Sequence, residues 1–170
     1  YGEAMAILVG DGLLNLAFET CTKAYHGIFK YEGSMELDFY KRVSKSLEVL
    51  SNKAGIYGMI GGQVIDIEGN DKPAPKNRLD MMYGLKTGAL IEASMMIGAI
   101  LAGAETDEIN TIEKIAGDIG LAFQIRDDIL DVTSSQTELG KPVHSDEKNE
   151  KATYVTIMNL DKACNEVVVI

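Results

Sequence analysis

The stretch Gly117-Asp118-Ile119-Gly120-Leu121-Ala122-Phe123-Gln124-Ile125-Arg126-Asp127-Asp128-Ile129-Leu130-Asp131 decides the fold. Small and then polar side chains recur in it at steps of three or four residues, which places them on one face of an α-helix. They are Gly117, Gly120, Gln124, Asp127 and Asp131. Each glycine inside a helix costs about 1 kcal/mol relative to alanine. The glycines therefore indicate either close packing against another helix or a wall kept open for a ligand.

Helical spacing of apolar residues continues along almost the whole chain, and β-branched residues cluster only at residues 167–170. We therefore predict an all-α helical bundle that forms a single domain over residues 1–170. The expected helices are Glu3–Thr22, Met35–Asn52, Ala54–Glu68, Arg78–Leu101, Asp107–Asp131 and one that opens near Lys151. Thr106 is expected to be the N-cap of the helix that starts at Asp107.

Both ends of the chain indicate missing neighbours. The first helix is apolar nearly all round, which is typical of a helix surrounded by others. Its polar line faces a cavity, a subunit or solvent and consists of Asp11, Asn15 and Glu19. The last helix ends in four β-branched residues without a glycine or basic residue in its final turn. We expect further sequence on both sides, so that the bundle is incomplete at both ends.

The charge of the chain excludes one class of partner and constrains another. The formal net charge is -10, with 16 Lys and Arg against 26 Asp and Glu. Nucleic-acid binding needs clustered basic residues and is not expected. If an anionic ligand binds, metal ions or a few placed lysines must reverse the field locally.

The cysteines and the hydropathy of the chain indicate the cellular compartment that we expect. Cys21 and Cys164 lie far apart without metal-ligand spacing, which favours a reduced, cytoplasmic protein. The most apolar stretch, Gly88 to Ala102, is shorter than the roughly 20 residues that cross a bilayer and contains Glu92. We therefore expect a core helix there and no membrane span.

The acidic triplet is the strongest chemical signal. Asp127 and Asp131 lie one turn apart, and Asp128 lies about 100° round the axis. Like charges at this spacing weaken a helix by a few tenths of a kcal/mol, and carboxylates at its C-terminus oppose the macrodipole. Mg²⁺, which one or two carboxylates commonly hold together with water and phosphate oxygens, offsets both effects. The alternative is an exposed acidic helix end.

Other candidates are weaker when taken singly. Lys86 and Thr87 precede the apolar run, where a lysine more often snorkels to solvent than binds a ligand. Gly62 and Gln63, with Asp66 on the next turn, offer the same choice between packing and a ligand wall. The polar loop from residue 132 to 150 leads from Lys141 to Lys151, which either clasp a polyanion or carry ordinary surface charge.

Taken together, these features resemble the trans-isoprenyl diphosphate synthases of the polyprenyl synthetase family, in particular bacterial short-chain farnesyl and geranylgeranyl diphosphate synthases. The resemblance covers the full chain, and the order of its motifs makes it specific. The motifs are Tyr1-Gly2-Glu3-Ala4 with Gly10-Asp11, Gly62-Gln63-Val64-Ile65-Asp66, Lys86-Thr87-Gly88, Phe123-Gln124 with residues 127–131, and Gly140-Lys141 with Asp146, Lys151 and Thr153. It implies the isoprenoid synthase helical bundle.

The resemblance also implies chemistry, namely a Mg²⁺-dependent prenyltransferase that condenses isopentenyl diphosphate with an allylic diphosphate. Asp127 is expected to bind Mg²⁺ directly, and Asp128 and Asp131 mainly through water. Lys86, Lys141 and Lys151 are expected to contact the diphosphate, where they help the departing pyrophosphate. The resemblance also implies that Thr87 and Gln63 are catalytic side chains along the path of the cation. Phe123 and Gln124 are expected to form a wall of the substrate site. Asp66 is expected to support a neighbouring side chain in that site.

Parts of the family pattern precede Tyr1, so they are not in this chain. They are the first aspartate-rich motif, the residues that hold isopentenyl diphosphate and those that set product length. We therefore predict no turnover by the 170-residue chain alone, and expect a homodimer for the family. Three alternatives stay open: a class I terpene cyclase, a non-catalytic partner of a heteromeric synthase, and an acidic helical bundle without a ligand.

Overall fold

The computed structural model describes residues 2–28, 33–69, 75–135 and 152–170, and every regular element within these ranges is a helix. The all-α prediction is confirmed. The helices are α1 (Glu3–Ile28), α2 (Ser34–Ala54), α3 (Met59–Gly69), α4 (Lys76–Tyr83), η1 (Gly84–Gly88), α5 (Ala89–Ala102), α6 (Thr106–Thr133), α9 (Tyr154–Met158) and α10 (Leu160–Val169).

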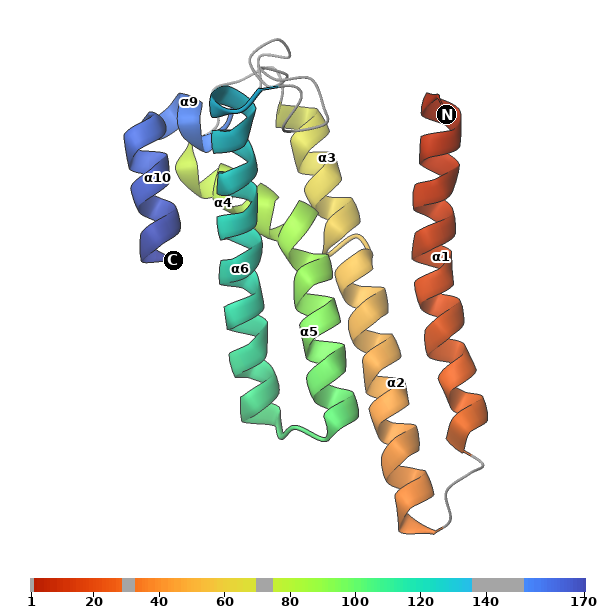
Figure 1. The fold of residues 1–170 in the computed structure, drawn as a ribbon. Helices are drawn as coiled ribbons and strands as arrows, with labels where there is room; N and C mark the ends of the chain where they lie inside the picture. The colour runs from red at the N-terminus through yellow and green to blue at the C-terminus, as the bar shows by residue number, and fades with distance from the viewer. Residues whose placement is uncertain (1, 29–32, 70–74, 136–151) are drawn as a thin grey trace.

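The helices α2, α5 and α6 run side by side, with α9 and α10 beyond α6 and α1 on the opposite side (Figure 1). Apolar side chains join them in two clusters. The first lies where α4, α6, α9 and α10 meet and contains Leu79, Tyr83, Ile125, Ile129, Tyr154 and Ala163. The second joins α2 to α5 and contains Val49, Ala93, Met96 and Ile100. The two clusters fix α6 and α5 as the centre of the bundle.

The start of α3 differs from the prediction. A helix was expected from Ala54, but α2 continues to Ala54 and α3 begins only at Met59. Between them the backbone turns, with Gly58 N donating to Gly55 O at 3.1 Å. A Cβ on Gly58 would lie 2.0 Å from Lys53 O, so a side chain at this position does not fit the turn. Helical spacing of the apolar residues gave no sign of this break.

The end of the chain forms two helices where one was predicted. α9 and α10 meet at Asn159, whose φ of 74° breaks the helix and whose side chain accepts a hydrogen bond from Lys162 N at 3.1 Å. The predicted start near Lys151 lies outside the described residues. At the start of α6, Glu105 precedes the helix instead of Thr106, and Glu105 N donates to Glu108 Oε2 at 2.8 Å. An acidic capping box therefore replaces the expected threonine cap.

One continuous helical rod contains α4, η1 and α5. Its middle part, η1, has the wider π-helical turn, and Lys86 and Thr87 lie in it. Short π turns inside α-helices are often found at functional sites, because the extra residue shifts the side chains that follow. Lys86 and Thr87 are thus set apart by backbone geometry as well as by residue type.

By length and composition alone, two of the described helices are apolar enough to cross a membrane, namely Glu3–Gly27 and Lys76–Ala102. A core helix of a soluble protein passes the same test. α5 buries Ala89, Ala93 and Met96 within the bundle, which agrees with the expected core helix. The absence of a membrane span stays a prediction.

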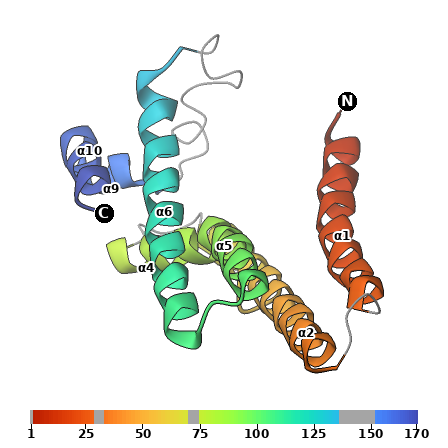
Figure 2. The same cartoon turned by 60° about the horizontal axis from the view of Figure 1, so that its bottom comes forward.

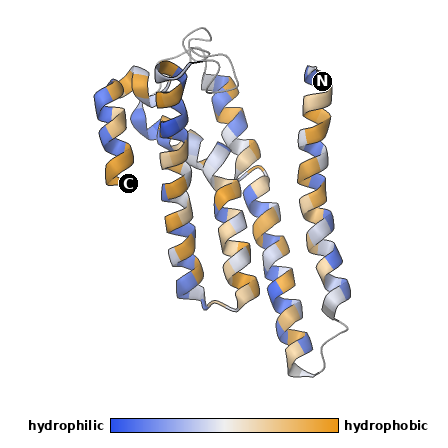
Figure 3. Ribbon diagram, viewed as in Figure 1, coloured by the Kyte–Doolittle hydropathy of each residue, from blue (hydrophilic) through white to orange (hydrophobic). Residues whose placement is uncertain are grey.

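The helix α1 packs on α2 and stands away from α6 (Figure 2). Hydrophobic residues recur along α1 (Figure 3). The exposed ones include Met5, Ile7, Leu8, Val9, Leu13 and Leu16. An apolar groove of about 850 Å³ runs between α1 and the helices α2, α3 and α5. The predicted polar line of Asp11, Asn15 and Glu19 is exposed. Both cysteines are free thiols.

Glycines allow helices to approach η1 from both sides. A Cβ on Gly120 of α6 would lie 2.6 Å from Gly88 Cα, and one on Gly62 of α3 would lie 2.2 Å from Lys86 N. Such distances do not occur for real Cβ atoms, so the backbone itself would have to move. At these two positions the structure supports the close-packing interpretation of the glycines.

Replacing Gly120 by alanine should therefore destabilise the fold. We expect Gly120→Ala to lower the free energy of unfolding by about 1–3 kcal/mol, because the added methyl overpacks the contact with η1. Gly98→Ala is the matched control: Gly98 is exposed in the middle of α5 and has open space around it. That variant should gain about 0.5–1 kcal/mol from the lower flexibility of the unfolded chain. Urea denaturation of both variants measures the contrast, and equal effects of the two would contradict the packing account.

Candidate functional site

A cavity of about 270 Å³ lies where α3, the α4–η1 junction, α6 and the start of α9 meet. Its lining residues come from distant parts of the sequence and are Asp66, Met82, Tyr83, Lys86, Gln124, Asp127, Asp128, Ala152 and Thr153. Carboxylate, ammonium, amide and hydroxyl groups thus share one small space. The structure thus brings together part of the sequence-predicted motifs, namely Asp66, Lys86, Gln124, Asp127 and Asp128.

The two polar residues of η1 reach in different directions. Lys86 Nζ forms an ion pair with Asp66 Oδ2 of α3 at 2.6 Å, and both side chains are largely buried, at 28% and 17% exposure. Thr87 Oγ1 donates a hydrogen bond to Gln124 Oε1 of α6 at 2.9 Å. The π turn therefore links α3 to α6 through polar contacts. Asp66 holds a neighbouring side chain, as expected, and its role toward a substrate stays a prediction.

The three aspartates of the acidic triplet have different surroundings. Asp127 is half-buried and lines the cavity. Asp128 also lines it but is buried, and its Oδ2 accepts hydrogen bonds from Tyr83 Oη at 2.7 Å and from Tyr154 N at 2.9 Å. Asp131 is buried and is not among the lining residues. An exposed acidic helix end does not describe this arrangement, since a buried carboxylate needs hydrogen bonds or opposite charge.

Besides Thr87 and Asp131, two predicted site residues in the described part of the chain do not line the cavity, namely Gln63 and Phe123. Gln63 is exposed on α3, because Gly62 and Asp66 occupy the face that packs on η1 and Gln63 is turned about 100° from Gly62. Phe123 is 61% exposed, one residue away from the inward-facing Gln124. Lys141 and Lys151 lie outside the described residues. Their roles therefore stay predictions.

Sequence reasoning missed the two tyrosines that support the cavity. Tyr83 and Tyr154 stack with their ring centroids 5.9 Å apart, and both hold Asp128, one through its hydroxyl and the other through its backbone N–H. Tyr83 lies three residues before Lys86, one turn along the same helix. That spacing was the available signal, but an apolar interpretation of the tyrosine was equally consistent with it.

The Tyr154 side chain continues the network away from the cavity. Its hydroxyl donates to Asp80, and Lys76 Nζ lies 3.2 Å from Tyr154 Oη. Lys76 also pairs with Asp80 and with Glu166 of α10, each at 3.1 Å. Burial raises the pKa of Tyr154 to about 12, and the hydrogen bond to Asp80 acts in the same direction. Burial acts to lower the pKa of Lys76, but its hydrogen bonds to Asp80, Tyr154 and Glu166 outweigh burial and raise it.

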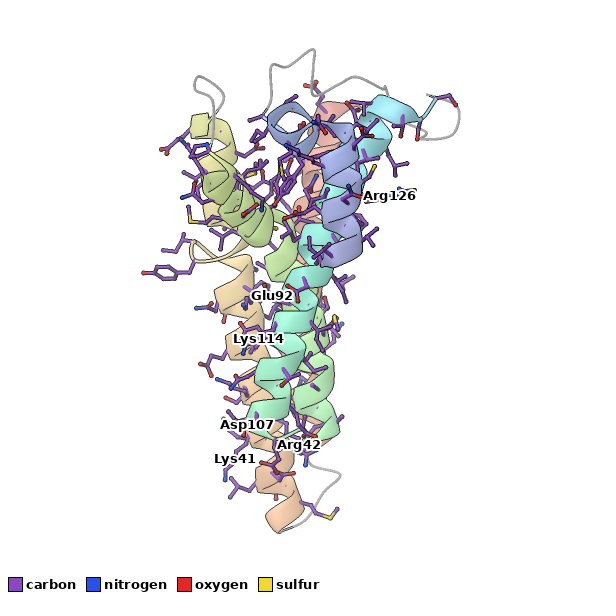
Figure 4. The ribbon with its side chains drawn as sticks, turned by 90° about the vertical axis from the view of Figure 1, so that its left-hand side faces the viewer. Lys41, Arg42, Glu92, Asp107, Lys114 and Arg126 are labelled. Carbon is purple, nitrogen blue, oxygen red and sulfur yellow. The ribbon has the colours of Figure 1, made fainter. Side chains whose placement is uncertain are left out.

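A second ion cluster joins three helices below the cavity. Lys53 of α2 pairs with Glu92 of α5 and, at 2.6 Å, with Glu113 of α6. Figure 4 shows Glu92 between these neighbouring helices. Burial acts to lower the pKa of Lys53, while its hydrogen bonds to Glu113 and Glu92 outweigh that effect and raise it. The cluster explains how a lone buried glutamate in the apolar α5 is tolerated.

Comparison with known proteins decides the family. A model of the polyprenyl synthetase family matches residues 1–168. The chain belongs to the polyprenyl synthetase family. This agrees with the resemblance seen in the motifs at residues 62–66, 86–88 and 127–131.

Relatives of polyprenyl synthetase type cover nearly the whole chain. It is 39% identical over 160 residues to a farnesyl diphosphate synthase of Geobacillus stearothermophilus, which covers 94% of this chain and 51% of that protein. It is 41% identical over 166 residues to a chloroplastic heterodimeric geranylgeranyl pyrophosphate synthase large subunit of Arabidopsis thaliana, with 96% and 43% covered. These names favour a prenyltransferase over a terpene cyclase.

A solved structure supports the fold. The geranyltransferase of Helicobacter pylori, complexed with magnesium and isoprenyl diphosphate, superposes with a TM-score of 0.80 at 30% identity. The match covers 99% of this chain and 52% of that one. The chain thus has the all-α fold of these prenyltransferases and spans about half the length of the relatives it matches.

The raised pKa of Tyr154 predicts a pH-dependent stability. The pKa of Tyr154 is about 12 in the folded protein and 10.0 in the unfolded chain. The protonated hydroxyl therefore contributes its full share to the free energy of unfolding below pH 10, and this contribution declines as the pH rises toward about 12. Tyr154→Phe should be less stable than the unaltered protein at pH 9, and the difference should shrink as the pH rises to about 12. Denaturant unfolding across this range measures it. Tyr57→Phe, at an exposed position, is the matched control, and a pH-independent difference for Tyr154→Phe would refute the account.

Proposed function

We propose that this chain carries the Mg²⁺ and diphosphate site of a prenyltransferase that condenses isopentenyl diphosphate with an allylic diphosphate to a short-chain product of the farnesyl or geranylgeranyl class. The observation that supports this most directly is the cavity in which Asp127, Lys86 and Gln124 meet. The family match and the names of the relatives support the same class of reaction.

The side chains around the cavity fit a hard cation. In the described part of the chain, no three His, Cys, Asp or Glu side chains converge on a point that could hold a metal ion. Mg²⁺ does not need such a cage, because it commonly takes one or two carboxylates and completes its octahedron with water and phosphate oxygens. Asp127 is the carboxylate we assign to it, with Asp128 and Asp131 further out. The metal, when bound, neutralises charge on a diphosphate.

Lys86 supplies fixed positive charge on the wall of the cavity. Its ion pair with Asp66 holds the ammonium group in one position, so that little side-chain entropy has to be lost when an anion binds. A preorganised cation in a water-poor site stabilises a departing pyrophosphate more than a solvated lysine does. The predicted contacts of Lys141 and Lys151 with the diphosphate belong to this proposal.

Thr87 and Gln124 supply oxygen dipoles without a strong nucleophile. Their mutual hydrogen bond at 2.9 Å orients both side chains. Amide and hydroxyl oxygens near an allylic cation stabilise its charge, while the neutral groups are poor at trapping it. Gln63 is assigned with Thr87 to the path of the cation, and Phe123 with Gln124 to the wall of the substrate site.

The remaining expectations belong to the same proposal. A cytoplasmic homodimer is part of this proposal, and free cysteines agree with a reducing compartment. The absence of a membrane span agrees with the ion pairs that Lys86 and Glu92 form along the apolar rod.

Pyrophosphate binding tests the site assignment. Isothermal titration of the protein with pyrophosphate should show binding that depends on Mg²⁺. Asp127→Asn should weaken it by about 10- to 100-fold, because a charged ligand of the metal is worth about 1.5–3 kcal/mol. Asp118→Asn removes the same charge from an exposed position of α6 and is the control. Equal effects of the two substitutions would mean that Asp127 acts only through net charge and would overturn the assignment.

A further inference from the structure

Asp128 is placed unlike its neighbour Asp127. Both line the cavity, yet Asp128 is only 3% exposed. Its Oδ2 already accepts hydrogen bonds from Tyr83 Oη and Tyr154 N. A carboxylate oxygen has about two acceptor positions, so these donors use the capacity of this atom. The arrangement is that of a carboxylate held by the protein itself.

The two donors come from different elements, which the apolar cluster and the hydrogen bond from Tyr154 to Asp80 also hold together. Tyr83 ends α4 and adjoins η1, whereas Tyr154 begins α9. Their rings stack at 5.9 Å, and the Tyr154 ring is fully buried. Asp128 adds a buried polar link to this packing: it joins the start of α9 to α6 and, through Tyr83, to the helix that presents Lys86.

The segment anchored in this way is part of the cavity wall. Ala152 and Thr153 line the cavity and directly precede Tyr154. Thr153 is buried, and its N–H donates to Thr156 Oγ1 at 2.8 Å, so that the first turn of α9 is closed on itself. The wall and the helix thus move together, and the Tyr154 N–H is the point where α6 holds both.

We propose that Asp128 is a positioning residue for the diphosphate site: it anchors the Thr153–Tyr154 wall through hydrogen bonds, and it is not principally a ligand of the metal. This inference rests on the proposed function. It assigns different tasks to adjacent carboxylates, with Asp127 facing the ligand and Asp128 facing the protein. A hydrogen-bond acceptor is what the second task requires, and negative charge is not.

Conservative substitution separates the two tasks. Asparagine keeps an acceptor oxygen and loses the charge, so Asp128→Asn should bind pyrophosphate with Mg²⁺ within about threefold of the unaltered protein, whereas Asp127→Asn should lose about tenfold or more. Asp128→Ala removes the acceptor and should also lose about tenfold or more. These affinities are measured by titration of the whole protein that carries this chain.

Hydrogen exchange of the Tyr154 amide gives a readout that does not depend on ligand binding. The amide should stay protected in Asp128→Asn and Tyr83→Phe, and its protection should fall about tenfold or more in Asp128→Ala. If the alanine variant fails to fold, the asparagine variant still decides. A loss of pyrophosphate affinity in Asp128→Asn equal to that in Asp127→Asn, with the amide still protected, would make Asp128 a metal ligand and overturn the proposal.

Failure of the two proposals can be told apart. Absence of Mg²⁺-dependent pyrophosphate binding in the unaltered protein would overturn the proposed function. An unprotected Tyr154 amide in the unaltered protein, or full protection in a folded Asp128→Ala, would overturn the anchoring role whatever the ligand binding shows.

Discussion

Close approach of three backbones at η1 is the constraint on which the site depends. Gly62 of α3 and Gly120 of α6 have no Cβ, and for this reason both helices reach the backbone of the π turn. The approach sets the separation that the Lys86–Asp66 and Thr87–Gln124 contacts span. The polar side chains of the site are thus positioned by the two glycines as well as by their own hydrogen bonds and ion pairs.

The charged groups around the cavity are a second constraint on the site. The chain carries a net charge of -10, and the cavity contains several carboxylates. The acidic groups are nevertheless given separate partners: Asp66 faces a lysine, and Asp128 faces a hydroxyl and a backbone N–H. The described lining of the cavity holds three carboxylates, Asp66, Asp127 and Asp128, against one lysine. A bound metal ion is therefore what would reverse the local field for an anion.

Helical periodicity predicted the fold well and the site in part. It placed Gly120, Gln124 and Asp127 on one face, because i, i+3 and i+4 positions share a face in any helix. Periodicity does not say which neighbour a face meets, so it could not show that Gln63 and Phe123 are exposed in this chain. The breaks at Gly58 and Asn159 depend on single backbone conformations. The sequence did not predict the role of Tyr83 and Tyr154, because the ring of a tyrosine suits an apolar core and its hydroxyl suits a polar site.

The cluster of Lys53, Glu92 and Glu113 has a consequence for behaviour on heating. It ties the last turn of α2 to the first turn of α5 and to α6, with Lys53 and Glu92 largely removed from water and Glu113 partly so. The hydration of ions becomes less favourable as temperature rises, so the cost of burying these groups falls while their attraction persists. The net contribution of this cluster to the contact between the three helices consequently rises on warming.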